Sequence, residues 1–182
     1  MGDEVLFKDW EKPSWNEYYM GMAFQIAMRS IDPSTKQGCI VVGPHHEPLT
    51  LGYNSPPRGC LDHLIPITRP EKYPYMIHAE ENAIANAARK GIALIDSTFY
   101  ITGHPCSDCF KLMLQVGAKK IIYGPVTSNQ KCISPKDLEA IALMLKGREG
   151  FPFEKFSGNL NQVSKLMRMA ADYLDSESKR LI

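Results

Sequence analysis

The amino-acid sequence predicts an α/β fold, a three-layer α/β/α sandwich around a mixed sheet of about five strands. First, the strands predicted after residue 90 alternate with helices, which is typical of βα units and parallel pairing. Second, the first two predicted strands are joined by a short Gly/Pro/His loop, which favours an antiparallel hairpin. Third, the chain has 182 residues, of which 44% are hydrophobic and 23% are charged, enough for one core.

The N-terminal part predicts a helix followed by two strands. Ser14 and Glu17 form an S-x-x-E capping box, and apolar residues then recur at helical spacing to about residue 30. Residues 32–35, Asp-Pro-Ser-Thr, predict a turn. Residues 39–42 are a short apolar run typical of a buried strand, and we expect residues 49–53 to pair with it.

The middle of the chain predicts a long loop and then two helices that alternate with two strands. The loop, residues 54–76, is rich in proline, and loops of this length inside a compact domain are usually functional. Residues 78–90 and 106–116 predict helices, which end at Gly91 and Gly117. Residues 98–102 and 120–123 predict strands.

The C-terminal part predicts a helix, a strand and a final amphipathic helix. Ser134 caps the first helix and Pro135 occupies its first turn. Residues 151–156 predict the last strand. The final helix, about 161–179, has apolar residues along one face, which we expect to pack in the core or between subunits: Val163, Leu166, Met167, Ala170, Ala171 and Leu174. Residues 1–182 are therefore expected to form one domain, with its core at about 14–156.

Charge and cysteine usage exclude several classes of protein. Lys plus Arg number 21 and Asp plus Glu number 20, and a net charge of +1 argues against a large basic surface for duplex nucleic acid or anionic lipid. No apolar run is as long as a membrane-spanning helix, and residues 1–12 contain no signal-peptide core, so we expect a cytoplasmic protein. Five cysteines do not suggest a disulfide framework.

Two sequence motifs together predict a catalytic metal site. His78-Ala79-Glu80 is followed, 28 positions after His78, by a P-C-x-x-C segment with Cys106 and Cys109. The combination is the signature of zinc-dependent nucleobase deaminases. The two cysteines begin a predicted helix, so their sulfurs share one side and the helix N-terminus favours thiolates. One His and two Cys leave a ligand position for water, as in catalytic zinc sites.

Glu80 is the predicted catalytic acid and base. Zinc lowers the pKa of bound water from about 15.7 to roughly 7. Glu80 lies two residues after His78, and it would accept a proton from that water and deliver protons to the ring nitrogen and the departing amine. The implied reaction is hydrolytic deamination. The alternatives are a structural zinc knuckle, which would want a fourth ligand, and a redox or metal-free C-x-x-C, for which His78 and Glu80 would be coincidental.

Over residues 14–156 the chain resembles the deoxycytidylate (dCMP) deaminases, a family of the cytidine deaminase-like zinc hydrolases. Besides the two motifs, the resemblance rests on residues 14–20 (SWNEYYM), 32–35 (DPST), 52–60 (GYNSPPRGC) and 72–75 (KYPY). It implies a cytidine deaminase-like fold with Zn²⁺ on His78, Cys106 and Cys109. It also implies conversion of dCMP to dUMP plus ammonia, which supplies thymidylate synthesis, by a homo-oligomer that is often a hexamer.

The resemblance also implies sites for substrate and effector nucleotides. Asn54 is the substrate-binding candidate from the GYN segment, with Ala79 and Pro105 from the two motifs. The effectors are dCTP as activator and dTTP as inhibitor, each with Mg²⁺. The effector-loop candidates are Gly52, Tyr53, Pro57 and Gly59, and Ser55 stands where the family usually has glycine.

Phosphate binding requires local cationic or hydroxyl donors, and the predicted turn after the first helix offers them. The candidates are Arg29, Ser34 and Lys36, with a solvated turn as the alternative. His104 departs from the family pattern, and we expect it either to line the pocket or to be held by local packing.

Other functions and sites stay open at this point. The substrate could be dCTP or a 5-substituted dCMP. A tRNA adenosine deaminase shares both motifs, although the near-neutral charge and the GYN and KYPY segments oppose it. A zinc-containing binding protein without catalysis is a third alternative.

Cys60 with His63, and the adjacent His45 and His46, offer ligands for a second zinc but no recognisable four-ligand spacing. We expect nucleotide partners rather than a polynucleotide or a membrane. Cys39 and Cys132 are expected to be small buried hydrophobes.

Overall fold

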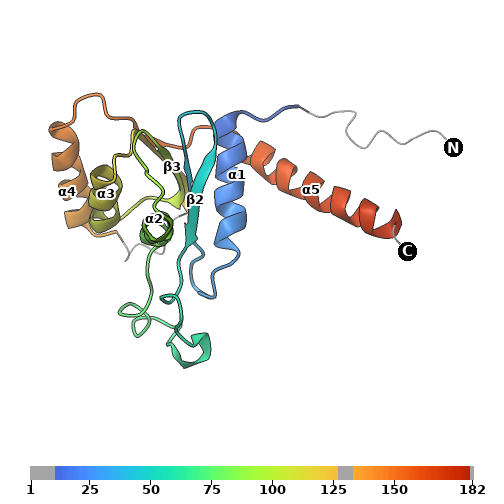
Figure 1. Ribbon diagram of the computed structural model, residues 1–182, viewed down its shortest axis with the longest axis horizontal. Coiled ribbons are helices and arrows are strands. Elements are labelled where there is room, and N and C mark those ends of the chain that lie inside the picture. The colour runs from blue at the N-terminus through green and yellow to red at the C-terminus, as the bar shows by residue number, and fades with distance from the viewer. Residues whose placement is uncertain (1–10, 127–132, 181–182) are drawn as a thin grey trace.

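A five-stranded mixed sheet lies at the centre of the computed structural model, which describes residues 11–126 and 133–180 (Figure 1). The strand order is β2-β1-β3-β4-β5. β1 (Gly38–Val42) is antiparallel to β2 (Pro48–Tyr53) and to β3 (Thr98–Gly103). β3 is parallel to β4 (Lys120–Val126), which is parallel to β5 (Phe153–Lys155). The predicted hairpin and mixed sheet are confirmed.

Helices cover both faces of the sheet, so the predicted three layers are also confirmed. One face is covered by α1 (Trp15–Ala27), and the other by α2 (Ala79–Lys90), α3 (Ser107–Gln115) and α4 (Pro135–Lys146). The last helix, α5 (Leu160–Arg180), packs against α1 at its N-terminal end and extends beyond it (Figure 1).

The core is divided between the two faces because successive side chains of a strand point in opposite directions. In β1, Ile40 and Val42 pack with Tyr19 and Met20 of α1. On the other face, the second cluster contains buried side chains of β1, β3 and β4 and of helices α2, α3 and α4: Val41, Phe99, Ile101, Ile121, Ala83, Phe110, Met113 and Ile141. Cys39 is fully buried in this cluster, as predicted, whereas Cys132 lies outside the described residues.

Several element boundaries differ from the prediction. α1 ends at Ala27, because the amides of residues 28–30 bond to carbonyls three residues earlier in a tighter turn. His78 and Cys106 are N-cap residues and precede the first helical residues. β4 continues to Val126, where it still pairs with Gly103 of β3. Within the described ranges, no helix is long and apolar enough to cross a membrane.

The loop between β2 and α2 projects away from the sheet (Figure 1). It contains a short 3-10 helix, Asp62–Leu64, and several turns. Two contacts attach its ends. Ser55 and Ile77 form an antiparallel bridge, and Lys72 forms a buried ion pair with Asp32 in the turn after α1. The loop is therefore fixed beside the starts of α2 and α3.

Candidate metal centre and active site

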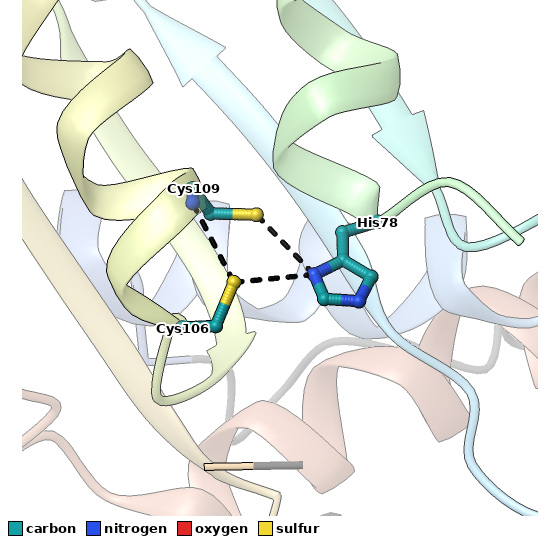
Figure 2. Close-up of side chains that lie close together, drawn as sticks. All are labelled: His78, Cys106 and Cys109. Carbon is teal, nitrogen blue, oxygen red and sulfur yellow. Dashed lines mark hydrogen bonds between the residues drawn. The ribbon is translucent and has the colours of Figure 1, made fainter. Parts of the chain in front are cut away.

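The three predicted metal ligands converge where α2 and α3 begin (Figure 2). His78 Nδ1 lies 3.5 Å from Cys106 Sγ and 3.3 Å from Cys109 Sγ, and all three atoms lie within 4.8 Å of one another. In a tetrahedral zinc site, bonds of about 2.3 Å to sulfur and 2.05 Å to nitrogen place those atoms about 3.5 Å apart. The three donors therefore fit Zn²⁺. Among residues 11–126 and 133–180 no second group of this kind occurs, so the pairs His45/His46 and Cys60/His63 form none.

The N-termini of the two helices position these ligands. His78 caps α2, and its backbone N–H donates to the Glu81 carboxylate at 2.9 Å. Cys106 caps α3, and its sulfur accepts from the backbone N–H of Cys109 at 3.5 Å. Hydrogen bonds from Cys109 and His78 outweigh burial and hold the pKa of Cys106 well below that of an ordinary thiol. Cys106 is thus a thiolate near neutral pH, the form that binds metals.

Glu80 lies in the first turn of α2 and lines the same pocket as His78 and Cys106. Glu80 is buried, with 8% of the residue exposed. Burial raises the pKa of Glu80 above its usual value, although the nearby His78 opposes this effect. A carboxyl group that takes up a proton more readily than usual is suited to general acid and base chemistry.

The pocket beside the metal ligands is lined by residues from five parts of the chain. They are the turn after α1, the long loop, the starts of α2 and α3, and the segment before α4. The lining residues are Asp32, Thr35, Gln37, Asn54, Arg69, Lys72, Tyr73, Met76, His78, Ala79, Glu80, Gly103, His104, Cys106 and Ile133. Asn54 and Ala79 are thus at the pocket, and Pro105 is buried beside it.

Asp32 is the centre of a buried hydrogen-bond network at this pocket. It accepts from Lys72 Nζ, from the backbone N–H groups of Ser34 (2.8 Å) and Thr35 (3.2 Å), and from Asn54 Nδ2 (3.2 Å). Burial raises the pKa of Asp32, but the hydrogen bonds from Lys72 and the two amides outweigh it, so the pKa lies below its usual value. The Lys72 ammonium therefore forms an ion pair with an ionised Asp32.

The network also fixes the orientation of the Asn54 side chain. Its Nδ2 donates to Asp32 and to the Thr35 carbonyl (3.0 Å), and its Oδ1 accepts from the Gln37 backbone N–H (2.8 Å). Both amide hydrogens are thus used, while the carbonyl oxygen has a second lone pair. Asn54 can therefore act on a ligand as an acceptor, which suits a hydroxyl group.

The three phosphate-binding residues predicted from the sequence do not line this pocket. Arg69, which the sequence did not indicate, does line it. Ser34 and Lys36 are not among the lining residues, and Lys36 Nζ donates to the Ser30 carbonyl. Arg29 lines a different pocket. Arg69 Nη2 donates to Thr35 Oγ1 at 2.9 Å, which brings the guanidinium to the pocket wall. The length and proline content of the loop were the signals that could have indicated Arg69 and Lys72.

His104 lines the pocket, and its ring is held by local packing as well. The ring meets those of Tyr123 and Phe153 edge to face, with centroids 4.8 and 5.3 Å away. Its Nδ1 lies 2.8 Å from the Pro105 carbonyl, which only accepts, so Nδ1 carries the proton. The other ring nitrogen is therefore an acceptor in the neutral side chain.

A second pocket adjoins the end of β2, where Tyr53 and Ser55 line it and Asn54, between them, lines the first pocket. Three of the effector-loop candidates line it, namely Tyr53, Pro57 and Gly59. Arg29, Arg58 and Arg89 also line it, which makes it suitable for an anion. Gly52 is not a lining residue. A Cβ at Gly52 would lie 2.2 Å from the Ala79 carbonyl oxygen, so this glycine allows β2 to pack directly against α2.

Comparisons with known proteins agree with this arrangement. A family model described as the cytidine and deoxycytidylate deaminase zinc-binding region matches residues 13–125. The deoxycytidylate deaminase of Mus musculus is 34% identical over 155 residues, covering 82% of this chain and 83% of that protein. The human deoxycytidylate deaminase is 37% identical over 115 residues, covering 60% and 64%. Among solved structures, the dCMP deaminase of cyanophage S-TIM5 in complex with dCMP and dUMP is 27% identical, with a TM-score of 0.64, covering 81% of this chain and 100% of that one.

Proposed function

The chain belongs to the cytidine and deoxycytidylate deaminase family, and from this premise we propose that it hydrolyses dCMP to dUMP and ammonia with Zn²⁺ as cofactor. The observation that carries the proposal is the juxtaposition of three metal ligands, a buried glutamate and a cationic loop residue at one pocket. The names of the similar mouse and human proteins and of the cyanophage structure support dCMP as the substrate.

The chemistry would be shared between a metal and Glu80. Zn²⁺ held by His78, Cys106 and Cys109 would supply a water whose pKa is lowered to about 7. Glu80 would take a proton from that water and deliver it to N3 of the cytosine ring. The oxygen then becomes bonded to C4, and Glu80 transfers the second proton to the 4-amino group. The C4–N bond breaks, ammonia leaves, and one water has been consumed.

The sugar and base would be held by residues already fixed in the pocket. Asn54 would accept a hydrogen bond from a sugar hydroxyl, because its amide hydrogens are used within the protein. Ala79 and Pro105 would contact the base, since they flank the metal ligands in both motifs. These assignments keep the substrate beside Glu80.

The 5′-phosphate would meet Arg69. Lys72 is held in a buried ion pair with Asp32, and the Arg69 guanidinium lies at the pocket wall, where it donates to Thr35 Oγ1. Guanidinium groups match phosphate oxygens in a bidentate manner. Ser34 and Lys36 belong to the same turn as Thr35 and would lie near the phosphate, while Arg29 lies on the second pocket.

The test is turnover, measured by the loss of cytosine absorbance. The wild-type protein should deaminate dCMP, and Glu80→Gln should reduce kcat by about 10²- to 10⁴-fold while retaining its zinc. Unchanged turnover in Glu80→Gln would overturn the role given to Glu80. If the wild-type protein leaves dCMP intact but deaminates dCTP, a 5-substituted dCMP or tRNA adenosine, the proposed substrate is wrong.

A second comparison tests the phosphate site. Arg69→Ala should lower kcat/KM for dCMP by about 10- to 100-fold, because a charge-assisted hydrogen bond is lost. Turnover of deoxycytidine, which has no phosphate, should be unaffected. Arg148→Ala removes an exposed arginine that does not line the pocket and is the matched control. Equal losses on both substrates would assign Arg69 a structural role.

We also propose that the second pocket binds an effector nucleotide with Mg²⁺, dCTP as activator and dTTP as inhibitor. Its three arginines and the loop residues Tyr53, Pro57 and Gly59 support this proposal. Saturation curves for dCMP with and without each effector plus Mg²⁺ would test it, and curves that coincide would exclude it.

The organisation of the protein belongs to the same proposal. Residues 1–182 are taken as one deaminase domain, in agreement with a single sheet that carries both core clusters. The family resemblance favours a homo-oligomer, and a hexamer is the state we expect. A cytoplasmic location would keep the described cysteines as free thiols.

A further inference from the structure

One face of α5 is apolar and is left exposed by the part of the chain that the structure describes. The helix contacts α1 through Val163, which is buried, and Leu166, which approaches Gly21. The neighbouring face is exposed to solvent, with exposed fractions of 43% for Leu160, 37% for Met167 and 68% for Leu174. Figure 1 shows that the C-terminal half of α5 extends away from the rest of the fold. Contiguous exposed apolar residues on a helix commonly mark an interaction surface.

The spacing of this face is that of a helix-pairing seam. Leu160, Ser164, Met167, Ala171, Leu174 and Ser178 follow one another at alternating intervals of four and three residues. This is the repeat that packs one helix against another. Ser164 and Ala171 are small, so a second helix could approach closely at the middle of the seam. The seam therefore fits a helix as its partner.

The charges beside the seam indicate which helix is its partner. Arg168 follows Met167 and Asp175 follows Leu174, so both lie on the same flank, and both are exposed. Arg168 Nη2 donates to Ser164 Oγ at 2.7 Å, which holds the guanidinium along that flank. A second α5 in antiparallel orientation would place its Asp175 opposite Arg168, and its Arg168 opposite Asp175. In a parallel pair, the heptad positions would instead set Arg168 against Val163 and Asp175 against Ala170.

We propose that this seam is an interface between two copies of the chain, in which the α5 helices pair antiparallel about a two-fold axis near Ala171. Two symmetric Arg168–Asp175 ion pairs set the register, and the apolar seam supplies the contact area. A two-fold interface requires one self-complementary patch, which is what the order of these charges provides. The matched family region ends at residue 125, so the interface is a property of this chain beyond that region. It does not depend on the proposed substrate.

Sedimentation velocity of the full-length protein over a range of concentrations tests the proposal. Leu174→Asp should abolish the α5-dependent association. Arg168→Glu and Asp175→Arg should each weaken it about tenfold, because each places like charges opposite one another twice. The double variant, Arg168→Glu with Asp175→Arg, should restore it, since the pairs are re-formed with exchanged signs.

Glu139→Arg makes the same change of charge as Asp175→Arg at an exposed position of α4, outside the seam, and should leave the association unchanged. Deaminase turnover and circular dichroism of each variant verify that it is folded. A protein that is monomeric at every concentration would overturn the proposal, as would an assembly whose mass is unaffected by Leu174→Asp. Failure of the double variant to recover association would overturn the antiparallel register.

Discussion

Replacing Lys72 by methionine removes one partner of the buried ion pair that fixes the long loop. Both side chains of the pair are only 4% exposed. Removing one partner of such a pair generally costs 3–5 kcal/mol, because the remaining charge is left buried. Asp32 would keep the amides of Ser34 and Thr35 and the Asn54 side chain as donors. We therefore expect the lower end of that range, about 3 kcal/mol.

The measurement is the free energy of unfolding from urea titrations at pH 7. Lys111→Met is the matched control, because Lys111 forms an exposed ion pair with Asp108 (side-chain exposures 59% and 74%). The control should lose less than about 0.5 kcal/mol. The double variant Lys72→Met with Asp32→Asn should recover part of the loss, because the buried charge is gone. A loss below about 1 kcal/mol in Lys72→Met would refute the reasoning from burial.

The same substitution should have a characteristic pH dependence. The native pKa of Asp32 is lowered, so its ionised form contributes stability above its unfolded pKa, about 3.9, and this contribution is lost as the pH falls towards the native pKa. Without Lys72 the pKa of Asp32 rises and the contribution shrinks. The difference between wild type and Lys72→Met should therefore be largest above about pH 5 and decrease below about pH 4. A difference that is constant from neutral to acid pH would contradict this account.

Three further predictions concern packing, capping and the metal. Gly52→Ala should destabilise the protein by about 2–3 kcal/mol in urea titrations, because its Cβ would overlap the backbone of α2, whereas Gly147→Ala, whose nearest contact would be 3.7 Å, should be nearly neutral. Asp137 accepts hydrogen bonds from Ser107 and Ser134, which lower its pKa. Asp137→Ala should therefore reduce the free energy of unfolding by about 1–2 kcal/mol at pH 7, and by less below about pH 4, because the carboxylate's contribution is lost on protonation. A cost that persists at low pH would exclude the ionised form as its source. Removing the metal with a chelator should abolish turnover and lower the unfolding temperature, because the metal ligands join α2 to α3. Adding Zn²⁺ should restore both. Full activity in metal-free protein would exclude the metal centre.

The metal centre could be predicted because its geometry is local in the sequence. His78 lies at a helix start, and Cys106 and Cys109 are three residues apart at another, so short-range spacing already orients the donors. Spacing alone does not determine which side of a sheet two helices occupy. The alternation of strands and helices supplied that information here.

Arg69 and Lys72 could not be placed from the sequence, because their positions depend on how a proline-rich loop folds back on the turn after α1. No periodicity describes such a loop, and its contacts with Thr35 and Asp32 join residues more than thirty positions apart. Gly52, by contrast, was singled out by a sequence motif, but its packing could not be predicted from that motif. Its place in the GYN segment suggested an effector role, which stays a prediction, and the close approach of β2 to α2 adds a packing role that the motif did not indicate.

Residues 53–55 contribute to the walls of both pockets. Tyr53 and Ser55 line the second pocket, and Asn54 lines the pocket of the metal centre. Ser30 and Asn82 clamp this segment through the carbonyls of Asn54 and Tyr53, at 2.7 and 2.8 Å. A ligand that displaces the segment from one side must move a wall of the other pocket by the same displacement. Coupling between the two pockets would therefore need no rearrangement of the sheet. Because such coupling is reciprocal, each ligand would change the affinity of the protein for the other ligand by an equal factor.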